Sequence, residues 1–406
     1  MRSNRVLSSA ALLLILAIAS LNAQNQEPPR VTFFPQLAVG GGAAGGFSCD
    51  FFITNQGIRA VDGVILRIFD NNGAPLVVQT QDFGATSTME FNLAAGETRV
   101  IPITGGDAVV EGYAVLQCPR LSPVRSTVVV RAQTGGVVFT QLGVPEQHPF
   151  SHFSFAAEVR PGIGTGLALV NPAPSAQDLV ISLIDQAGTL QGTKILTLQS
   201  GHHLALFLDD PRLFGAGLNF TGTATVSGAD HFGLLALRLE NANDPQNVVL
   251  GTLAINEGAV LSPYVVDGQD VPETEPNDTA QTADVIASLP VVLSGTISDM
   301  EQDYFRFTAQ QGDIITVLVE ADTLPDRSEL DSEIFVLDSN ENVVATNDQN
   351  GLGGPLSVET YLPQFDSFLR FVVPASGTYY LRIWDYFGDT GGEAFAYRMH
   401  VRSQTP

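Results

Sequence analysis

Lysine, cysteine and histidine are scarce in this sequence, and the residue patterns of common enzyme families are missing from it. The 406 residues include one lysine, two cysteines and six histidines. There is no G-x-S-x-G nucleophile turn and no H-E-x-x-H zinc motif. The glycine-rich stretch 40–46 lacks the Lys-Ser/Thr that a phosphate-binding loop requires. We therefore predict a protein that is not an enzyme.

Basic charge is also in short supply, since the formal net charge is −24. Residues 267–406 carry 24 acidic residues and 6 arginines, a net charge of −18, so most of the excess lies in the last third. Such a surface repels phosphate backbones and attracts divalent cations. We therefore do not expect a nucleic acid as a partner.

Long apolar runs are absent after the N-terminus. The run Val6–Ala19 follows Arg2 and Arg5 and precedes small and polar residues, which is the order of a secretory signal peptide. A membrane anchor, the alternative, would need about 18 apolar residues or more. We predict a signal peptide over residues 1–23, no membrane span, and a protein that is secreted, periplasmic or on the cell surface.

The two cysteines, Cys49 and Cys118, would then reach an oxidising compartment. In an exported chain such a pair favours a disulfide over a metal or catalytic site. A loop of that length closed by an unstrained disulfide would contribute about 4 kcal/mol. We predict a Cys49–Cys118 disulfide.

Helical periodicity is nearly absent, whereas short runs rich in Val, Ile, Leu, Phe and Thr recur between turn residues. Examples are "GVILRIFD" at 63–70 and "LVISLIDQ" at 179–186. Strands spaced in this way are typical of β-sandwiches and barrels. The sequence therefore predicts an all-β protein.

Part of the chain is duplicated. Residues 51–76 align with 167–192, and the likeness continues to the end of each copy. We predict two immunoglobulin-like β-sandwich repeats, at 31–146 and 147–265, a size that suits this fold. The matched residues are turn and strand-end types, so we interpret them as architectural: Asn55 with Asn171, Asp70 with Asp185, and Gly73 with Gly188. Over 33–257 the pair resembles an uncharacterised tandem module of secreted bacterial proteins, which implies a fold and no activity.

A polar linker at 266–272 leads to a third segment, 273–406, with alternating strands such as "DYFRFTA" and "GTYYLRIWD". Its motifs "EPNDT", "GTISDMEQDYFRF", "GDIITVLVEA" and "SGTYYLRI" occur in the order found in the bacterial pre-peptidase C-terminal domain. Over residues 273–402 the segment resembles that family. The resemblance implies a jelly-roll-like sandwich that serves export or attachment.

The start of this segment, "ETEPND", suits a hard cation. In an extended chain Glu273, Glu275 and Asn277 point the same way, and Pro276 favours extended geometry at Glu275. Calcium takes six to eight oxygen ligands of these kinds. In the alternative interpretation the stretch is an acidic linker, with Asp278 capping a helix over 279–286.

The same stretch is similar to the calcium-binding start of the collagen-binding domain of secreted bacterial collagenases. That resemblance implies Ca²⁺ as a cofactor, held by Glu273, Glu275, Asn277, Asp278, Asp299 and Asp303. It also implies an aromatic ligand-binding face, with Tyr380, Trp384 and Tyr386 as candidates.

We therefore expect an exported, non-catalytic protein of three β-domains, whose calcium-stabilised last domain acts in secretion or in attachment to an extracellular protein or polysaccharide. Two alternatives stay open. One is a secreted hydrolase with an active site between the repeats, and the other is a purely structural envelope or adhesion protein. The sequence does not define the oligomeric state.

Overall fold

The structure, a computed structural model, describes residues 29–41, 45–241, 248–258, 262–298, 301–348, 366–388 and 391–405. The predicted signal peptide lies outside the described residues. Strands make up almost all of the regular structure, so the all-β prediction is confirmed. Within the described ranges, no helix has the length and apolar character needed to cross a bilayer.

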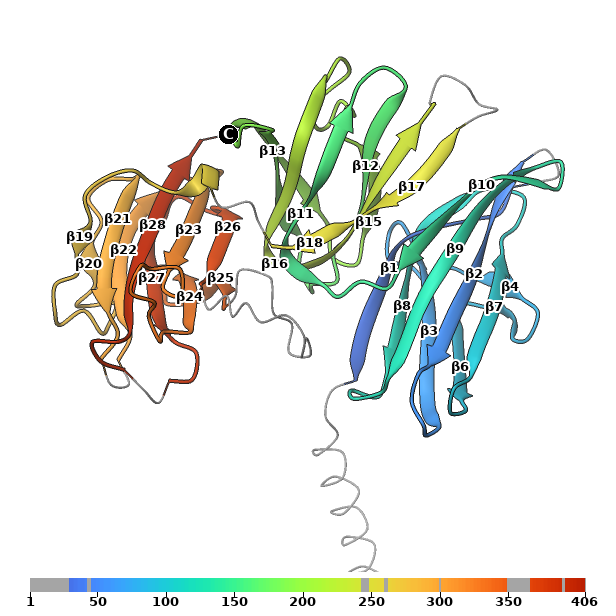
Figure 1. Cartoon of the computed structure of the whole chain (residues 1–406), viewed down its shortest axis with the longest axis horizontal. Coiled ribbons are helices and arrows are strands. Elements are labelled where there is room, and N and C mark those ends of the chain that lie inside the picture. Colours follow the sequence, from blue (N-terminus) through green and yellow to red (C-terminus); the bar gives the residue numbers. More distant parts are fainter. Residues whose placement is uncertain are drawn as a thin grey trace, which may run out of the picture.

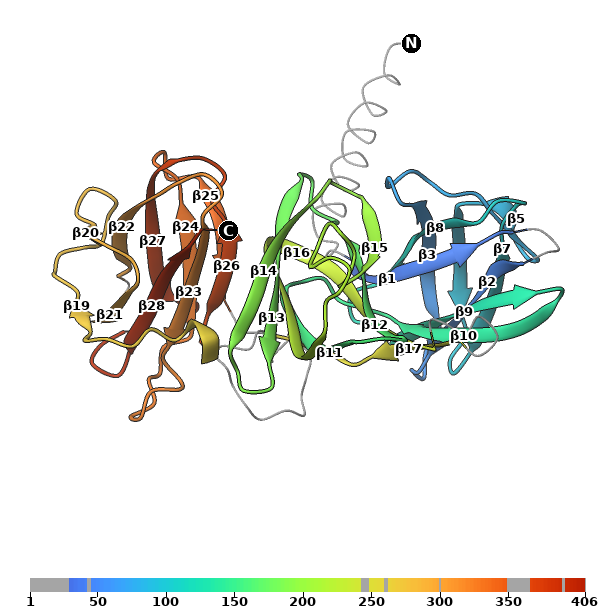
Figure 2. The ribbon, with the colours of Figure 1, turned by 90° about the horizontal axis from the view of Figure 1, so that it is seen from above.

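The strands form three sandwiches that follow one another along the long axis of the molecule (Figure 1). The view from above shows the same order, with the second sandwich between the other two (Figure 2). We call them repeat 1, repeat 2 and the C-terminal domain. The linker between the last two includes a short 3-10 helix, η1 (Ser262–Tyr264).

Repeat 1 consists of two facing sheets with strand orders β1-β8-β3-β6 and β10-β9-β2-β7-β4-β5. Its strands alternate between buried and exposed residues, as half-buried strands do. The strand bounds are β1 Arg30–Val39, β2 Gly46–Asn55, β3 Val61–Asp70, β4 Val78–Thr80, β5 Gly84–Thr86, β6 Thr88–Leu93, β7 Thr98–Thr104, β8 Val110–Cys118, β9 Val124–Thr134 and β10 Val137–Pro145.

The predicted disulfide is wrong, because both thiols in repeat 1 are free and buried. Cys118 pairs with Arg30 at the start of β1, whereas the Cys49 thiol donates to the Ala38 carbonyl near the end of β1, at 3.2 Å. Eight residues of strand separate these two places, roughly 26 Å. The Cα atoms of a disulfide lie within about 7 Å of each other. The pair therefore lies at opposite ends of the sandwich.

Repeat 2 is built around one long strand, β16, which joins two sheet regions. Its first half pairs with β11 and β13, and its second half pairs with β12 and β17. The strand bounds are β11 Phe150–Val159, β12 Ile163–Val170, β13 Gln177–Asp185, β14 Leu190–Leu198, β15 His203–Phe207, β16 Phe220–Glu240, β17 Val249–Leu253 and β18 Ile255–Glu257.

The residues that recur between the repeats have the same structural role in each copy. The Asn55 side chain donates to the carbonyls of Arg59 and Ala94, and its Oδ1 accepts from the Gly57 amide. Asn171 makes the same kind of bonds, to the carbonyls of Ser175 and Leu198 and from the Ala173 amide. Asp70 and Asp185 each accept two backbone amides within a hairpin turn. Gly73 and Gly188 both have positive φ in those turns.

The two repeats meet through apolar packing, in which Leu235 joins the core cluster of repeat 1, and through a polar contact centred on the buried His203. Its ring nitrogens lie 2.8 Å from Asn71 Oδ1 and 3.2 Å from Gln36 Oε1, both in repeat 1. The Tyr113 hydroxyl donates to the Gly201 carbonyl nearby, at 2.9 Å. Burial lowers the pKa of His203 to about 4. The imidazole is therefore neutral at pH 7.

The C-terminal domain has two five-stranded sheets, with orders β19-β21-β28-β23-β26 and β20-β22-β27-β24-β25. Leu369 and Phe371 point into its core, together with Phe305, Phe307 and Ile383. The strand bounds are β19 Val271–Pro272, β20 Asp284–Val285, β21 Val291–Thr296, β22 Asp303–Ala309, β23 Ile314–Glu320, β24 Ser332–Leu337, β25 Val343–Asn347, β26 Phe368–Val372, β27 Gly377–Asp385 and β28 Ala396–Gln404.

Candidate metal centre

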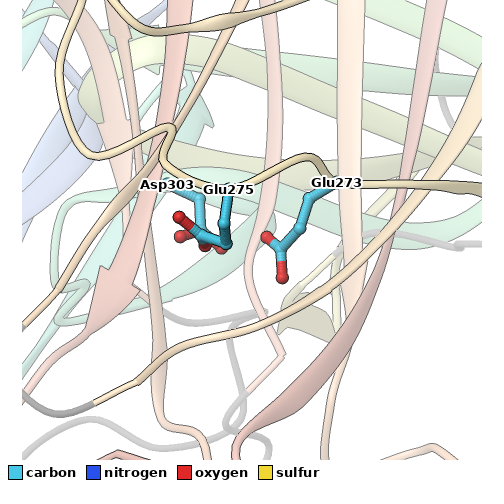
Figure 3. Close-up of side chains that lie close together, drawn as sticks. All are labelled: Glu273, Glu275 and Asp303. Atoms are coloured by element: carbon cyan, nitrogen blue, oxygen red, sulfur yellow. The ribbon is translucent and has the colours of Figure 1, made fainter.

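Three carboxylates from separate parts of the C-terminal domain come together at its edge. Glu273 follows β19, Glu275 lies in the loop before β20, and Asp303 begins β22. One oxygen from each lies within 4.8 Å of an oxygen from both others. The three side chains point toward one another (Figure 3). The structure thus brings three of the predicted ligands, Glu273, Glu275 and Asp303, close together.

The Glu273 side chain is held against β21. Its backbone amide donates to the Ser294 carbonyl at 2.9 Å, and its Oε1 accepts from the Thr296 amide at 2.7 Å. The side chain passes directly over Gly295, where an added Cβ would lie 2.2 Å from Glu273 Oε2. A larger residue at 295 would therefore displace the Glu273 carboxylate and the Tyr397 hydroxyl, which lies 2.4 Å from the same Cβ position.

Asp303 and Glu273 share the hydroxyl of Tyr397, a residue of β28. The hydroxyl oxygen lies 2.6 Å from Asp303 Oδ2 and 3.0 Å from Glu273 Oε2. A tyrosine hydroxyl carries one proton, so it donates to one carboxylate at a time. The other contact needs a further proton or a cation. Asp303 Oδ1 is buried and has no hydrogen-bond partner in the described protein.

Asn277 is the most unusual residue of this region. Its side chain is 0% exposed, yet neither its Oδ1 nor its Nδ2 has a hydrogen-bond partner within the described residues. Its backbone is fixed, since its carbonyl accepts from the Tyr304 amide and its amide donates to Glu275 Oε2. Each buried polar group without a partner costs about 1–3 kcal/mol. An oxygen held in this state is a candidate ligand.

A second acidic group adjoins the first and shares Glu275 with it. Glu275, Asp278 and Glu301 also have oxygens within 4.8 Å of one another. The Glu301 carboxylate accepts from the Ser298 amide at 2.8 Å. The sequence prediction included Asp278 but missed Glu301. Asp299, also predicted, lies outside the described residues.

The electrostatics of the cluster oppose ionisation of its members. Burial, followed by the hydrogen bond to Glu273, raises the pKa of Asp303 to about 9. Burial also raises the pKa of Glu275, with smaller effects from the neighbouring carboxylates of Glu301, Glu273 and Asp278. The pKa of Tyr397 lies well above its usual value for the same reason, because burial and two carboxylates disfavour its anion. A positive charge among these groups would be strongly stabilised.

The donor set suits a hard cation. It consists of carboxylate and amide oxygens, with no histidine or cysteine in either group of described residues. Zinc sites in proteins use mainly nitrogen and sulfur ligands, whereas calcium uses oxygens at about 2.3–2.6 Å. Asn277 Oδ1 and Asp303 Oδ1, which are buried and without a partner in the described protein, are oxygens of the kind that calcium binds.

The alternative interpretation, a capped helix after Asp278, is wrong. Residues 279–282 form a turn closed by Thr279 and Thr282, whose hydroxyl oxygens lie 2.8 Å apart, and β20 follows. The strand β20 then pairs in parallel with β22. This pairing brings the acidic loop next to Asp303.

The predicted aromatic residues lie elsewhere in this domain, on the outer face of β27 and just beyond it. Trp384 Nε1 donates to Glu333 at 2.6 Å, and its ring contacts that of Phe335. Tyr380 is partly buried on the same face, and Tyr386 in the following turn is 50% exposed. Tyr379, Leu381 and Ile383 alternate with them along β27 and point into the core.

Sequence reasoning missed Tyr397, Gly295 and Glu301. Alternation along "AYRMHVRS" marks Tyr397 as facing the core, but nothing in it reveals a hydroxyl between two carboxylates. The contact with Glu273 depends on β28 lying beside β21, and the contact with Asp303 depends on the facing sheet that contains β22. Glu301 could have been found, because it is an acid two residues before Asp303.

Comparison with known proteins agrees with the resemblance seen in the sequence. Residues 301–383 match the family model described as the bacterial pre-peptidase C-terminal domain. The matched part includes Asp303 and most of β27 but not the stretch 273–278. The chain therefore contains a pre-peptidase C-terminal domain, as predicted.

The chain is also 27% identical to a probable subtilase-type serine protease of Deinococcus radiodurans, over 248 residues. The aligned part covers 54% of this chain and 32% of the protease, so it spans about a third of that relative. Among solved structures, an α-L-rhamnosidase of Streptomyces avermitilis complexed with L-rhamnose aligns with 94% of this chain and 45% of its own. For this pair the sequence identity is 10% and the TM-score is 0.19.

Proposed function

We propose that the acidic edge of the C-terminal domain binds a calcium ion, and that the chain is an exported, non-enzymatic binding protein. The observation that carries the proposal is Asn277, whose buried side-chain amide has no hydrogen-bond partner in the described protein, while its backbone amide donates to Glu275 of the carboxylate cluster. A cation would supply the missing partner for its oxygen and would offset the repulsion among the carboxylates.

The ion would be held by Glu273, Glu275, Asn277 and Asp303, with Asp278 and Glu301 next to them. Calcium accepts more ligands than magnesium and tolerates less regular geometry, which suits carboxylates from a loop and a strand. Bound there, it would join the loop 273–278 to β22 and so fix the start of the domain. The role of the ion is structural in this proposal.

The proposed cellular role is secretion or attachment outside the cell. The pre-peptidase C-terminal domain and the similarity to a subtilase-type protease both support an extracellular or cell-surface location. The face with Tyr380, Trp384 and Tyr386 is the proposed contact for an extracellular protein or polysaccharide. Rigid aromatic side chains of this kind are frequent energetic centres of interfaces.

Thermal unfolding of the full chain, freed of metal by chelation, tests the calcium site. Binding to the folded state contributes about 2.7 kcal/mol at a hundredfold excess over Kd, which raises Tm by several degrees. We expect this rise with calcium, and we expect it to be lost in Glu275→Gln. Glu329→Gln, an exposed acid of the same domain, is the matched control and should keep it. Equal Tm values in calcium and in chelator would refute the site.

The attachment proposal is tested separately, by sedimentation with insoluble extracellular proteins and polysaccharides. Tyr386→Ala should weaken retention on the ligand, since half of this side chain is exposed and it touches Phe387. Val343→Ala, another exposed apolar position in the same domain, is the control. Retention that is unchanged by Tyr386→Ala would exclude this residue from the contact.

A further inference from the structure

Repeat 2 and the C-terminal domain bury a face that neither needs for its own core. On β13, the side chains of Leu179, Ile181 and Leu183 form the core of repeat 2. Val180 and Ser182 point to the opposite side, where an isolated sandwich would face water, and both are fully buried. Thr225 and Ser227 of the paired strand β16 are buried in the same way. This face is covered by the C-terminal domain.

The covering element is β26, whose own residues alternate between the core and repeat 2. Leu369 and Phe371 point into the C-terminal core, whereas Phe368 and Arg370 point outward and are still buried. Phe368 packs edge-on against His152 of repeat 2, with ring centroids 5.3 Å apart. Two sheets therefore stack face to face across the domain boundary, as the halves of a sandwich do.

Arg370 lies at the centre of the contact and is 1% exposed. Its Nη1 donates to Ser182 Oγ at 2.5 Å and to the Tyr264 hydroxyl at 3.0 Å. Its Nη2 donates to Gln404 Oε1 at 3.2 Å and lies 3.5 Å from Thr193 Oγ1. Its guanidinium also stacks on the Tyr264 ring, 4.8 Å from the centroid. One side chain thus joins repeat 2, the linker and β28.

The partners of Arg370 are all uncharged. In the part of the chain that the structure describes, no carboxylate lies within ion-pair distance of it. A buried cation held only by hydroxyls, an amide and a ring depends on good geometry, because the desolvation cost is not offset by an opposite charge. Such a contact gives specificity and is insensitive to salt, since screening acts mainly on exposed charges.

A second group of contacts flanks the first. Asn347 Nδ2 donates to Ser151 Oγ of repeat 2 at 3.3 Å, and Asn347 Oδ1 accepts from the Phe368 amide at 3.0 Å. Ala229 of β16 packs against the core of the C-terminal domain. Together with Arg370, these contacts extend across β25 and β26.

The covalent link, by contrast, is exposed at residues 267–270. We propose that the face of repeat 2 around Ser182 is a docking site for the C-terminal domain, and that it holds this domain whether or not the linker is intact. The docked pair is then one unit, and cutting the linker does not release the C-terminal domain. This inference is independent of calcium, since the contact uses β25 and β26 while the acidic edge lies beside β19 and β20 (Figure 1).

The test uses the full chain with a specific protease site inserted after Gly268. After cleavage of the folded protein, we expect both fragments to elute together in size-exclusion chromatography at 1 µM and 50 µM, in 0.1 M and in 1 M NaCl. Separation of the fragments at 50 µM in low salt would overturn the proposal. Separation only in 1 M salt would also overturn it, because the contact would then be an attraction between exposed charges.

Ser182→Lys identifies the site, because it places a cation against Arg370. Like charges brought together in an interface cost several kcal/mol, so we expect the association to weaken at least about 100-fold. Ser182→Thr, which keeps the hydroxyl, should leave the fragments together. Co-elution of the Ser182→Lys fragments would overturn the assignment of this face. If that variant does not fold, Ala229→Arg is used instead, because it disrupts the packing of β16 against the C-terminal domain. The fragments of this variant must separate.

Discussion

Three asparagines among the described residues are fully buried, and they differ in what surrounds them. Asn55 and Asn171, at matching places in the repeats, satisfy their side chains with backbone groups of nearby turns. Asn277 in the C-terminal domain has no side-chain hydrogen bond in the described protein, and its backbone amide donates to the Glu275 carboxylate. Folding maintains such an orphaned amide only at a cost. The first two are therefore structural, and the third has the features of a ligand.

The largest expected effect follows from removing a satisfied asparagine. Asn171→Ala leaves the carbonyls of Ser175 and Leu198 and the amide of Ala173 without their partner. At about 1–3 kcal/mol for each buried group, the free energy of unfolding should fall by at least about 3 kcal/mol, equally with and without calcium. The change in the free energy of unfolding is measured by urea unfolding monitored by circular dichroism. A loss below 1 kcal/mol would mean that the amide is not structural.

A smaller effect is expected from pH, through the buried His203 between the repeats. Its pKa is about 4 when folded and about 6.5 in a free chain. The unfolded state therefore binds more protons in this range, so stability falls as the pH drops from about 6.5 to 4, by about 3 kcal/mol in total. The measurement is unfolding free energy against pH for wild type and His203→Gln. Parallel curves for the two proteins would show that His203 is not the titrating group.

The unsatisfied asparagine should behave in the opposite way to Asn171. Asn277→Leu loses no side-chain hydrogen bond, so in chelator the variant should be as stable as wild type or more stable by about 1 kcal/mol. In calcium it should gain less stability than wild type does. Thermal unfolding in both conditions gives the comparison. If Asn277→Leu costs more in chelator than in calcium, Asn277 is structural after all.

A reducing agent is expected to have no effect on the stability of repeat 1, which makes this the smallest of the predicted effects. Cys49 and Cys118 are free and lie at opposite ends of β1. Adding dithiothreitol should leave the Tm of repeat 1 unchanged, whereas breaking a disulfide that closes this loop would cost about 4 kcal/mol. Labelling of the unfolded chain should find two thiols without prior reduction. A single labelled thiol, or none, would contradict the free state of the pair.

Much of the fold could be predicted from local patterns. Alternation in "DYFRFTA" and "GTYYLRIW" indicates strands with one face inward, and the aligned Asp70 and Asp185 mark equivalent hairpins. The disulfide was mispredicted because compartment and spacing carry no information on where the two strands place their cysteines. The disulfide prediction failed because the positions of the two cysteines depend on the tertiary arrangement of the strands.

Only part of the candidate site could be predicted, because local patterns do not reveal contacts that depend on tertiary arrangement. The side-chain period of an extended chain brings Glu273 and Glu275 to one face, and an acid near the "DYF" strand follows from the resemblance. The hydroxyl of Tyr397 in β28, more than 90 residues from Asp303, becomes its neighbour only because the sheets that contain β28 and β22 face each other. The docking face had a local signal, since "LVISLI" in β13 has apolar residues on both faces, Val180 and Ile184 lying on the face with Ser182. Such a strand needs cover on both faces.

The central claim is that Asn277 lacks a protein partner because it is a cation ligand. The most direct measurement is a crystal structure of the full chain grown in calcium, with anomalous difference density used to locate the ion. We predict a peak at about 2.3–2.6 Å from Asn277 Oδ1 and from the carboxylates of Glu273 and Asp303. Density for an ordered water bonded to the Asn277 amide, with no anomalous peak beside it, would contradict the account.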